Sequence, residues 1–212
     1  MTDKPDKNQV TIEPKENGPL LVKGLKTLTD AQGNPVEIKK DVIALCRCGA
    51  SSNKPFCDGT HKTNGFTSVR EISKPLDRER AYRGKSITVH DNRTICSHAA
   101  YCVKELKTVF KKDAQPWINP DGDSVDAIIR VVEKCPSGAL SYEINDDHKR
   151  DVDDRDPQIN FLANGPYNVC GHIHIESELQ PPSAEHFSLC RCGASKNKPF
   201  CDGAHYDVEF DQ

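Results

Sequence analysis

The chain has 212 residues, of which 35% are hydrophobic and 29% are charged, and its formal net charge is −3 at pH 7. This polar composition argues against one large core and favours two or three small domains stabilised by bound metal. The charge excludes the broad basic surface of a nucleic-acid-binding protein. No apolar run approaches the roughly 20 residues of a membrane helix, so we expect no membrane association.

The N-terminal sequence, MTDKPDKNQV, lacks the apolar segment of a secretory signal, so we expect a soluble, cytoplasmic protein. Such a protein rarely forms disulfides, and its ten cysteines therefore need another explanation. Nine of them fall into tight groups. Reduced thiolates that bind metal explain this grouping better than unrelated buried thiols do.

The first predicted unit contains an apolar segment at 17–24, a turn-rich stretch at 30–35 and a second apolar segment at 43–45. The apolar segments are typical of strands, and the turn-rich stretch suits a hairpin tip. The sequence CRCGASSNKPFCDGTH follows directly, from Cys46. The same order returns from 164 and ends in CRCGASKNKPFCDGAH, from Cys190. We call these two cysteine-rich stretches the cassettes.

The pattern changes between the two units. Alternation at 86–89 predicts a short strand, helical spacing of apolar residues at 99–110 and 124–134 predicts two helices, and 139–144 predicts a closing strand. Asp123 or Ser124 is placed to cap the second helix. The acidic stretch that follows predicts a solvated linker.

Both cassettes have the spacing C-x-C-x8-C-x3-H. Two cysteines that alternate along an extended strand end share one side, and one helical turn would bring the third cysteine and the histidine onto one face. Asp58 and Asp202 stand where a helix N-cap would be. Three thiolates and an imidazole can hold a zinc ion or an iron–sulfur cluster, and the C-x-C spacing with a loop rich in Gly, Ser and Asn favours the cluster.

Both cassettes resemble the CDGSH iron–sulfur domain of the mitoNEET type, whose motif is C-x-C-x2-S-x3-P-x-C-D-G-S-H. Every position matches except the last serine, which is Thr60 in the first copy and Ala204 in the second. The resemblance implies one 2Fe–2S cluster in each copy. The implied ligands are Cys46, Cys48, Cys57 and His61 in the first copy, and Cys190, Cys192, Cys201 and His205 in the second.

Two further expectations follow from this resemblance. Family members with a single motif form intertwined homodimers, so we expect the two units to pair within one chain, as a monomer with an internal pseudo-dimer. Thr60 keeps a hydroxyl near the ligand histidine and Ala204 does not. Because hydrogen bonds around a cluster tune it, we predict that the two reduction potentials differ.

The middle segment contains CSHAAYC from Cys96 to Cys102, followed by Cys135 and Pro136 in CPSGAL. Over roughly 80–145 it resembles the divergent mono-cluster ferredoxin-like domain that occurs fused to CDGSH motifs. Ala99 replaces the central cysteine of the ferredoxin pattern, so three thiolates remain. They suit a 3Fe–4S cluster, or a 4Fe–4S cluster whose fourth iron takes water, an external ligand or His98. The alternative is that Cys96 and Cys102 are buried structural thiols.

Several candidate residues remain outside these motifs. Cys170, His172 and His174 alternate, so on one strand they would share a face and could bind metal, although simple exposure also explains them. The other three histidines have no partner visible in the sequence: His90, His148 and His186.

The expected fold is α+β, with two small β-rich CDGSH units at 8–68 and 160–212, a ferredoxin-like α+β domain at 69–145 and a charged linker at 146–159. The expected function is transfer of single electrons between redox proteins, a reductase and an acceptor. The alternative is a cluster carrier or a redox or pH sensor, because protonation competes with iron for the histidine; a zinc scaffold is a third hypothesis. No catalytic triad, phosphate loop or nucleotide fingerprint is recognisable, so we expect no enzymatic activity.

Overall fold

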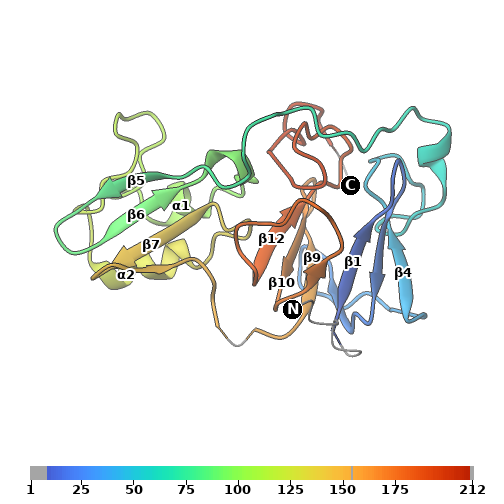
Figure 1. Cartoon of the computed structure of the whole chain (residues 1–212), viewed down its shortest axis with the longest axis horizontal. Helices are drawn as coiled ribbons and strands as arrows, with labels where there is room; N and C mark the ends of the chain where they lie inside the picture. The colour runs from blue at the N-terminus through green and yellow to red at the C-terminus, as the bar shows by residue number, and fades with distance from the viewer. Residues whose placement is uncertain (1–8, 154, 211–212) are drawn as a thin grey trace.

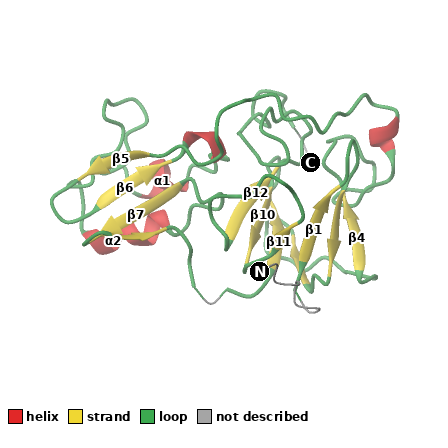
Figure 2. Cartoon of the chain, viewed as in Figure 1, coloured by secondary structure: helices red, strands yellow, loops and turns green. Residues whose placement is uncertain are grey.

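The computed structural model describes residues 9–153 and 155–210. The outermost residues of the predicted units, 8 and 211–212, and one linker residue, 154, lie outside this range. The described part contains three four-stranded sheets and two short α-helices, joined by long loops (Figures 1 and 2). The predicted α+β class is confirmed.

The first sheet lies at one end of the molecule, where Figure 1 labels β1 and β4. Its strand order is β11-β1-β2-β4, and β11 runs parallel to β1. Leu20, Val22 and Leu45 alternate inward and are fully buried, which is why these segments form strands with one face on the core. The strands are β1 (Thr11–Pro14), β2 (Leu20–Lys23), β4 (Val42–Leu45) and β11 (His174–Ile175).

The second sheet repeats this arrangement with the other half of the chain. Its order is β12-β10-β9-β3, and β3 runs parallel to β9. The strands are β9 (Gln158–Phe161), β10 (Tyr167–Cys170), β12 (His186–Leu189) and β3 (Thr27–Thr29). Each sheet therefore contains three strands of its own unit and one from the other unit, so the two units are intertwined within a single chain.

Strand exchange gives the two units a common hydrophobic core. Ile12, Leu28, Ile159 and Ile175, each at most 1% exposed, belong to one cluster of buried side chains that draws on both sheets. Neither unit of about 50 residues has to supply a core alone. The sequence-based expectation that each small unit depends on metal for its core is therefore replaced by a shared apolar core.

The middle domain forms the third sheet, of order β5-β6-β7-β8, with both α-helices packed beside it (Figure 2). The apolar stripe of α2 supplies Ile128, Val131 and Val132 to a second, separate core. The Ser124 side chain accepts a hydrogen bond from the Ala127 N–H, so Ser124 is the cap of α2. The elements are β5 (Arg80–Arg83), β6 (Thr88–Asp91), β7 (Leu140–Ile144), β8 (Asp147–Lys149), α1 (Tyr101–Glu105) and α2 (Val125–Val132).

Several predicted element bounds were wrong. The strand expected at 86–89 is β6, two residues later, and the helix expected at 99–110 shortens to α1, because the chain turns after Glu105 to make the Phe110–Ile118 bridge. The strands that were not predicted include β1, β3, β5, β8 and β9. Each is only three or four residues long and gains its stability from a neighbouring strand, so it leaves little periodic signal.

The predicted linker at 146–159 is also more structured than expected. It contains β8 and the first residues of β9. Arg155 forms an ion pair with the fully buried Glu185, and Ser183 Oγ donates to Asp151 Oδ1 at 2.6 Å. These contacts fasten the linker to the second unit. Within the described residues, no helix has the length and apolarity of a membrane-spanning segment.

Candidate metal sites

The first cassette folds back against the end of β4. The Cys46 N–H donates to Pro55 O and the Cys57 N–H donates to Ala44 O, each at 2.8 Å. This return brings the third cysteine beside the first two. The second cassette does the same at the end of β12, where the N–H groups of Cys190 and Cys201 donate to the carbonyl oxygens of Pro199 and Ser188.

Each cassette presents its four donor groups as two close pairs. In the first cassette, Cys46 Sγ lies 3.6 Å from Cys48 Sγ, and Cys57 Sγ lies 3.4 Å from His61 Nδ1. The corresponding distances in the second cassette are 3.8 Å and 3.5 Å. Two ligands of one tetrahedral ion, at bond lengths of about 2.0–2.3 Å, lie at such a separation. We call the two sets of donors the N-terminal site and the C-terminal site.

Backbone groups also point at the sulfur atoms. The Gly59 N–H donates to Cys57 Sγ at 3.4 Å, and the Gly203 N–H donates to Cys201 Sγ at the same distance. Gly59 adopts φ 93° and Gly203 adopts φ 89°, a left-handed conformation that favours glycine. Amides that donate to thiolate sulfur suit an iron–sulfur cluster, whose sulfurs carry negative charge, and the donor set therefore fits such a cofactor.

The helical turn predicted between Cys57 and His61 is a 3-10 helix, η1 (Thr60–Lys62), that begins after Gly59. Asp58 does not cap it. Instead the Asp58 carboxylate accepts hydrogen bonds from the Ser52 and Thr60 N–H groups, at 2.8 and 3.0 Å, and closes the cassette loop. A hydrogen bond from the Thr60 hydroxyl, followed by those two N–H groups, holds the pKa of Asp58 well below its usual range.

The Thr60 hydroxyl, which precedes His61 in the chain, bonds within the cassette loop. It donates to Asp58 Oδ1 at 2.7 Å. In the second cassette Ala204 lacks this hydroxyl, and Asp202 still accepts from the backbone N–H groups of Lys196 and Ala204. The two loops are thus closed in nearly the same way.

The arginine between the first two cysteines was not identified from the sequence as important. Arg47 Nε donates to Gly18 O at 2.7 Å, and Arg191 Nε donates to Gly165 O at 2.8 Å. Both guanidinium groups are nearly fully buried. Each arginine joins its cassette to the turn between the first two strands of its unit. In the sequence, only its position between two cysteines, on the opposite side of the strand, could have indicated this role.

The two CDGSH-type sites differ most in burial. Cys201 is 3% exposed and His205 is 6% exposed, whereas Cys57 and His61 are only half-buried. Burial raises the pKa of Cys201 to about 12. A hydrogen bond from Cys190 lowers the pKa of Cys192 to about 7. The C-terminal site is therefore the more enclosed of two similar sites.

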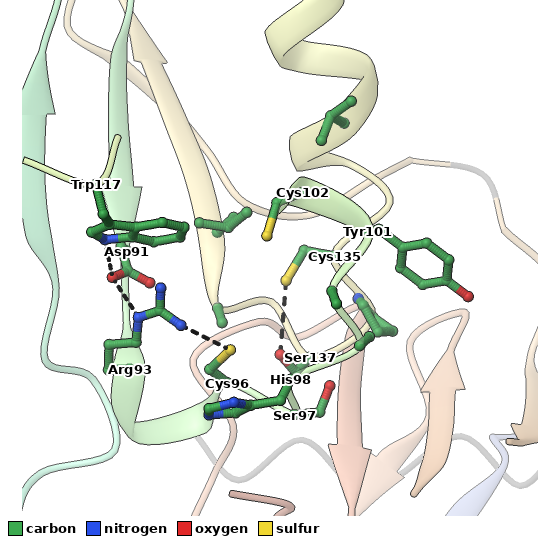
Figure 3. A pocket seen from close by; sticks show the side chains of 16 residues that line it. Asp91, Arg93, Cys96, Ser97, His98, Tyr101, Cys102, Trp117, Cys135 and Ser137 are labelled. Atoms are coloured by element: carbon green, nitrogen blue, oxygen red, sulfur yellow. Dashed lines mark hydrogen bonds and ion pairs between the residues drawn. The ribbon is translucent and has the colours of Figure 1, made fainter. Parts of the chain in front are cut away.

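The three cysteines of the middle domain come from three separate segments and line one pocket (Figure 3). Cys96 follows the short 3-10 helix η2 (Arg93–Ile95), Cys102 lies in α1, and Cys135 follows α2. Figure 3 shows their sulfur atoms directed into the same space. Burial raises the pKa of both Cys96 and Cys102 to about 11, so iron is needed to keep these thiols ionised. We call this set the middle site.

A charged side chain that the sequence did not single out stands beside the middle site. Arg93 Nη1 donates to Cys96 Sγ at 3.5 Å, and its Nε donates to Asp91 Oδ2 at 3.0 Å. The guanidinium also lies over the Trp117 ring, 4.0 Å from its centroid. Because Trp117 Nε1 donates to Asp91 as well, the arginine is held in place against the sulfur (Figure 3).

His98 lines the same pocket, next to Cys96 (Figure 3). Its ring also meets the second cassette, because a methyl group added at Gly203 would lie 2.7 Å from His98 Cδ2. Its backbone adopts φ 58°, and its carbonyl oxygen accepts a hydrogen bond from the Tyr206 hydroxyl at 3.2 Å. Ligation of the middle cluster by His98 stays a prediction.

The group Cys170, His172 and His174 does not share one strand face. β10 ends at Cys170, Gly171 and His172 have positive φ, and His174 begins β11 in the other sheet. The break in the strand separates the three side chains, so a metal site there is not supported.

Two of the three unassigned histidines gather with Glu79. The donor atoms of Glu79, His90 and His148 lie within 4.8 Å of one another on the middle sheet. Arg150 forms an ion pair with Glu79, and His148 Nε2 lies 2.8 Å from Ser141 Oγ, whereas His90 Nε2 is buried without a hydrogen-bond partner among the described residues. His186 pairs with the buried Glu185, at 2.9 Å.

Three regions of the chain match known protein families. Residues 17–62 and 164–206 match the family described as "Iron-binding zinc finger CDGSH type", and residues 82–145 match the family described as "Divergent 4Fe-4S mono-cluster". The protein called "Uncharacterized protein YjdI" in Escherichia coli K12, and the protein of that name in strain O157:H7, are each 41% identical over 63 residues. That match covers 30% of this chain and 83% of each relative. No solved structure matches this chain.

Three sets of thiols at such spacings, two of them completed by a histidine, define an iron–sulfur protein. The chain belongs to the CDGSH iron-binding family, in a form that carries two CDGSH units with a divergent mono-cluster domain between them.

Proposed function

We propose that the chain transfers single electrons between redox proteins, a reductase and an acceptor, and that it does so in the cytoplasm as a monomer without catalysing a reaction of its own. Its cofactors are two 2Fe–2S clusters and one 3Fe–4S or 4Fe–4S cluster. Such clusters supply one-electron redox chemistry when bound. The protein residues hold them, shield them from water and set their electrostatic surroundings.

The spacing of the donors supports two irons in each cassette. A single tetrahedral zinc ion would bring all four donors within about 4 Å of one another. We compared the positions of the histidine, cysteine, aspartate and glutamate donor atoms. In residues 9–153 and 155–210, three or more of these donors lie within 4.8 Å of one another only at Glu79, His90 and His148. Each cassette therefore has two separated pairs, which suits a cluster in which one pair binds each iron.

The observation that carries the electron-transfer proposal is the direct contact between the two cassettes. A methyl group added at Gly193 would lie 2.8 Å from Cys48 O, and one added at Gly49 would clash with Cys192 O. The residue after the second cysteine of each cassette thus packs on the second cysteine of the other cassette. Sites in contact through their own ligand residues are arranged for exchange of electrons between clusters.

The alternative function, cluster transfer or sensing, draws its support from the N-terminal site. His61 is half-buried there, and protonation of a histidine ligand competes with iron. The burial of His205 and Cys201 opposes release of a cluster from the C-terminal site. One accessible site and one enclosed site suit a relay better than a carrier that gives up both clusters.

The test compares two rates in the purified, fully loaded chain. After rapid mixing with one equivalent of dithionite, stopped-flow absorbance and freeze-quench EPR follow the redistribution of electrons among clusters, and incubation with an apo-ferredoxin follows cluster transfer. We expect electron redistribution to be faster. Complete transfer of clusters to the apo-ferredoxin without fast internal redistribution would instead establish the carrier.

Iron and sulfide analysis with EPR tests the cofactor content. Both cassettes should show the EPR signal of a histidine-ligated 2Fe–2S cluster after reduction. A signal from the oxidised chain identifies a three-iron cluster at the middle site, and its absence with a higher iron content identifies a four-iron cluster. A colourless protein that contains zinc would contradict the proposal.

A further inference from the structure

We infer that the three sites form a line in which the C-terminal site lies between the N-terminal site and the middle site. We also infer that His98 connects the C-terminal site to the middle site. This inference rests on the proposed electron transfer and adds to it the order of the sites. Two observations support it. The middle domain contacts the second cassette, and the two cassettes differ in burial although their sequences are nearly identical.

The middle domain packs against the second unit. The Asn197 side chain, in the second cassette, donates to Thr94 O at 2.8 Å, two residues before the Cys96 ligand. On the other side of the pocket, a methyl group added at Gly138, three residues after Cys135, would lie 2.9 Å from Ser183 Cβ. Both ends of the middle site are thereby fixed to the second unit.

The segment that leads into the middle domain is fastened to the same cassette. The Glu71 N–H donates to Lys196 O at 2.8 Å, and Arg70 Nε donates to Asn197 Oδ1 at 2.8 Å. By contrast, within residues 9–153 and 155–210, no hydrogen bond or ion pair joins residues 77–150 to residues 9–68. Figure 1 shows the same order along the long axis: the middle sheet with β5, β6 and β7, then β10 and β12, then β1 and β4.

His98 brings the middle site into direct contact with the C-terminal site. It is the second residue after the Cys96 ligand, and its ring lies on Gly203, between the Cys201 and His205 ligands. Gly203 is buried by this contact. Gly59, the equivalent residue of the first cassette, has no atom within 4 Å of the corresponding methyl position. This contact is one of several that distinguish the second cassette from the first.

The other neighbour of the C-terminal site is the N-terminal site, through the reciprocal contacts of Gly49 with Cys192 and of Gly193 with Cys48. The C-terminal site thus touches both other sites. Its ligands Cys201 and His205 are covered, while His61 and Cys57 at the N-terminal site remain half-exposed. The N-terminal site is the end at which a partner redox protein gains access, and the C-terminal site is the enclosed relay.

The electron balance is simple. With clusters bound by the three sets of ligands, a reduced carrier protein would give one electron to an end site and would itself be oxidised by one electron. The electron would pass by way of the C-terminal site to the other end, where an acceptor protein would be reduced by one electron. No bond between protein atoms forms or breaks.

Dipolar EPR on the reduced, fully loaded chain tests the order without requiring any electron transfer. We expect the middle cluster to couple more strongly to the C-terminal cluster than to the N-terminal cluster. Removal of the C-terminal cluster by Cys190→Ser with Cys201→Ser should leave the middle cluster without its strong coupling and abolish redistribution between the two end sites. The matched pair, Cys46→Ser with Cys57→Ser, should preserve exchange between the C-terminal and middle sites.

His98→Ala tests the connection itself and leaves all eleven predicted cassette and cysteine ligands in place. It should slow exchange between the C-terminal and middle sites severalfold and leave exchange between the two cassettes unchanged. His174→Ala, which removes an exposed histidine on β11, is the control and should change neither rate. If His98→Ala instead removes the middle cluster, the Gly203→Ala variant provides the test: it should weaken the dipolar coupling to the middle cluster, whereas Gly59→Ala should not.

The outcomes separate the order from the function. Stronger coupling of the middle cluster to the N-terminal cluster, or undiminished exchange between the end sites without the C-terminal cluster, would overturn the linear order even if electron transfer is fast. The expected couplings with no electron redistribution in the unmodified chain would overturn the proposed function and leave the arrangement of the sites intact.

Discussion

The hydroxyl group of Tyr167, in the second unit, donates a hydrogen bond to the carbonyl oxygen of Cys46, in the first cassette, at 2.7 Å. Tyr167 is fully buried and also lies 3.0 Å from Pro55 O. The residue at the equivalent position of the first unit is Leu20, which has no hydroxyl. The N-terminal site is therefore supported by a polar contact from the other unit that the C-terminal site does not receive.

Tyr167→Phe should lower the free energy of unfolding by about 1 kcal/mol, because the carbonyl oxygens lose a buried donor while the ring still fills its space. It should also speed loss of the N-terminal cluster in mild acid. Urea unfolding and the decay of the N-terminal EPR signal measure the two effects. Tyr101→Phe, at an exposed tyrosine, should change neither; an equal effect of both variants would contradict the role of Tyr167.

Removal of iron should not unfold the chain. The intertwined sheets share one apolar core whose buried members include no cysteine, although Cys96 and Cys135 pack against it, so the iron-free chain should keep its strands and lose only part of its stability. Far-UV circular dichroism before and after chelation should give similar spectra, with a lower Tm for the iron-free chain. A random-coil spectrum after chelation would show that the cassettes are needed for folding.

Glu185 should stabilise the chain at neutral pH. Burial alone would raise the pKa of Glu185, but hydrogen bonds from His186, Arg155 and the Gly171 N–H outweigh it and lower the pKa to about 2, from an ordinary value of 4.5. A carboxyl whose pKa is depressed by folding contributes stability above its unfolded pKa. That contribution is lost as the pH falls from 4.5 towards 2.

Glu185→Gln should therefore cost about 2 kcal/mol at pH 7, the scale of a buried hydrogen bond to a charged group. The difference from the unmodified chain should shrink as the pH falls from 4.5 towards 2. Urea unfolding of the iron-free chains measures it without interference from cluster loss. Glu178→Gln, at an exposed glutamate, is the control, and a difference that stays constant below pH 4.5 would contradict the assignment.

The two CDGSH-type clusters should have different midpoint potentials, with the lower one at the C-terminal site. Reduction adds a negative charge, and the deeper burial around His205 makes that charge less favourable. Thr60→Ala should shift the N-terminal potential by less than the difference between sites, because this hydroxyl bonds Asp58. A redox titration followed by EPR decides; equal midpoints, or a larger effect of Thr60→Ala, would refute the burial argument.

Arg93 should raise the potential of the middle cluster, because its positive charge is held against Cys96 Sγ. Arg93→Ala should lower that midpoint by roughly 60 mV, a tenfold change in a one-electron equilibrium. Arg93→Lys should give a smaller shift, and Arg130→Ala, on the exposed side of α2, should give none. An unchanged midpoint in Arg93→Ala would contradict this role and show that Asp91 already neutralises the guanidinium.

The candidate ligands could be proposed from sequence because metal chemistry constrains local spacing. Cys46, Cys48, Cys57 and His61 lie within sixteen residues, so the loop that joins them brings them together whatever the rest of the chain does. The helix α2 was also predicted, because one buried face leaves a helical period. By contrast, β1 and β9 are stabilised by strands distant in sequence, and their own residues carry little signal.

Other properties depend on contacts between segments far apart in the chain. The partners of Arg93, the connection of Arg155 to Glu185 and the placement of His98 on Gly203 are set by packing between separate elements. The apparent group of Cys170, His172 and His174 failed for the same reason: positive φ at Gly171 and His172 ends the strand that would have aligned them.

The sequence by itself identified the candidate iron ligands and showed that the binding unit occurs twice, because ligand chemistry depends on residue type and short spacing. Only the tertiary structure decided that the two units exchange strands, that the middle domain packs on the second cassette, and that His205 is covered while His61 is not. The cassettes themselves differ at only two positions, so their different surroundings come from residues outside them. Tyr167, from the second unit, contacts the first cassette, and the inserted middle domain contacts the second cassette.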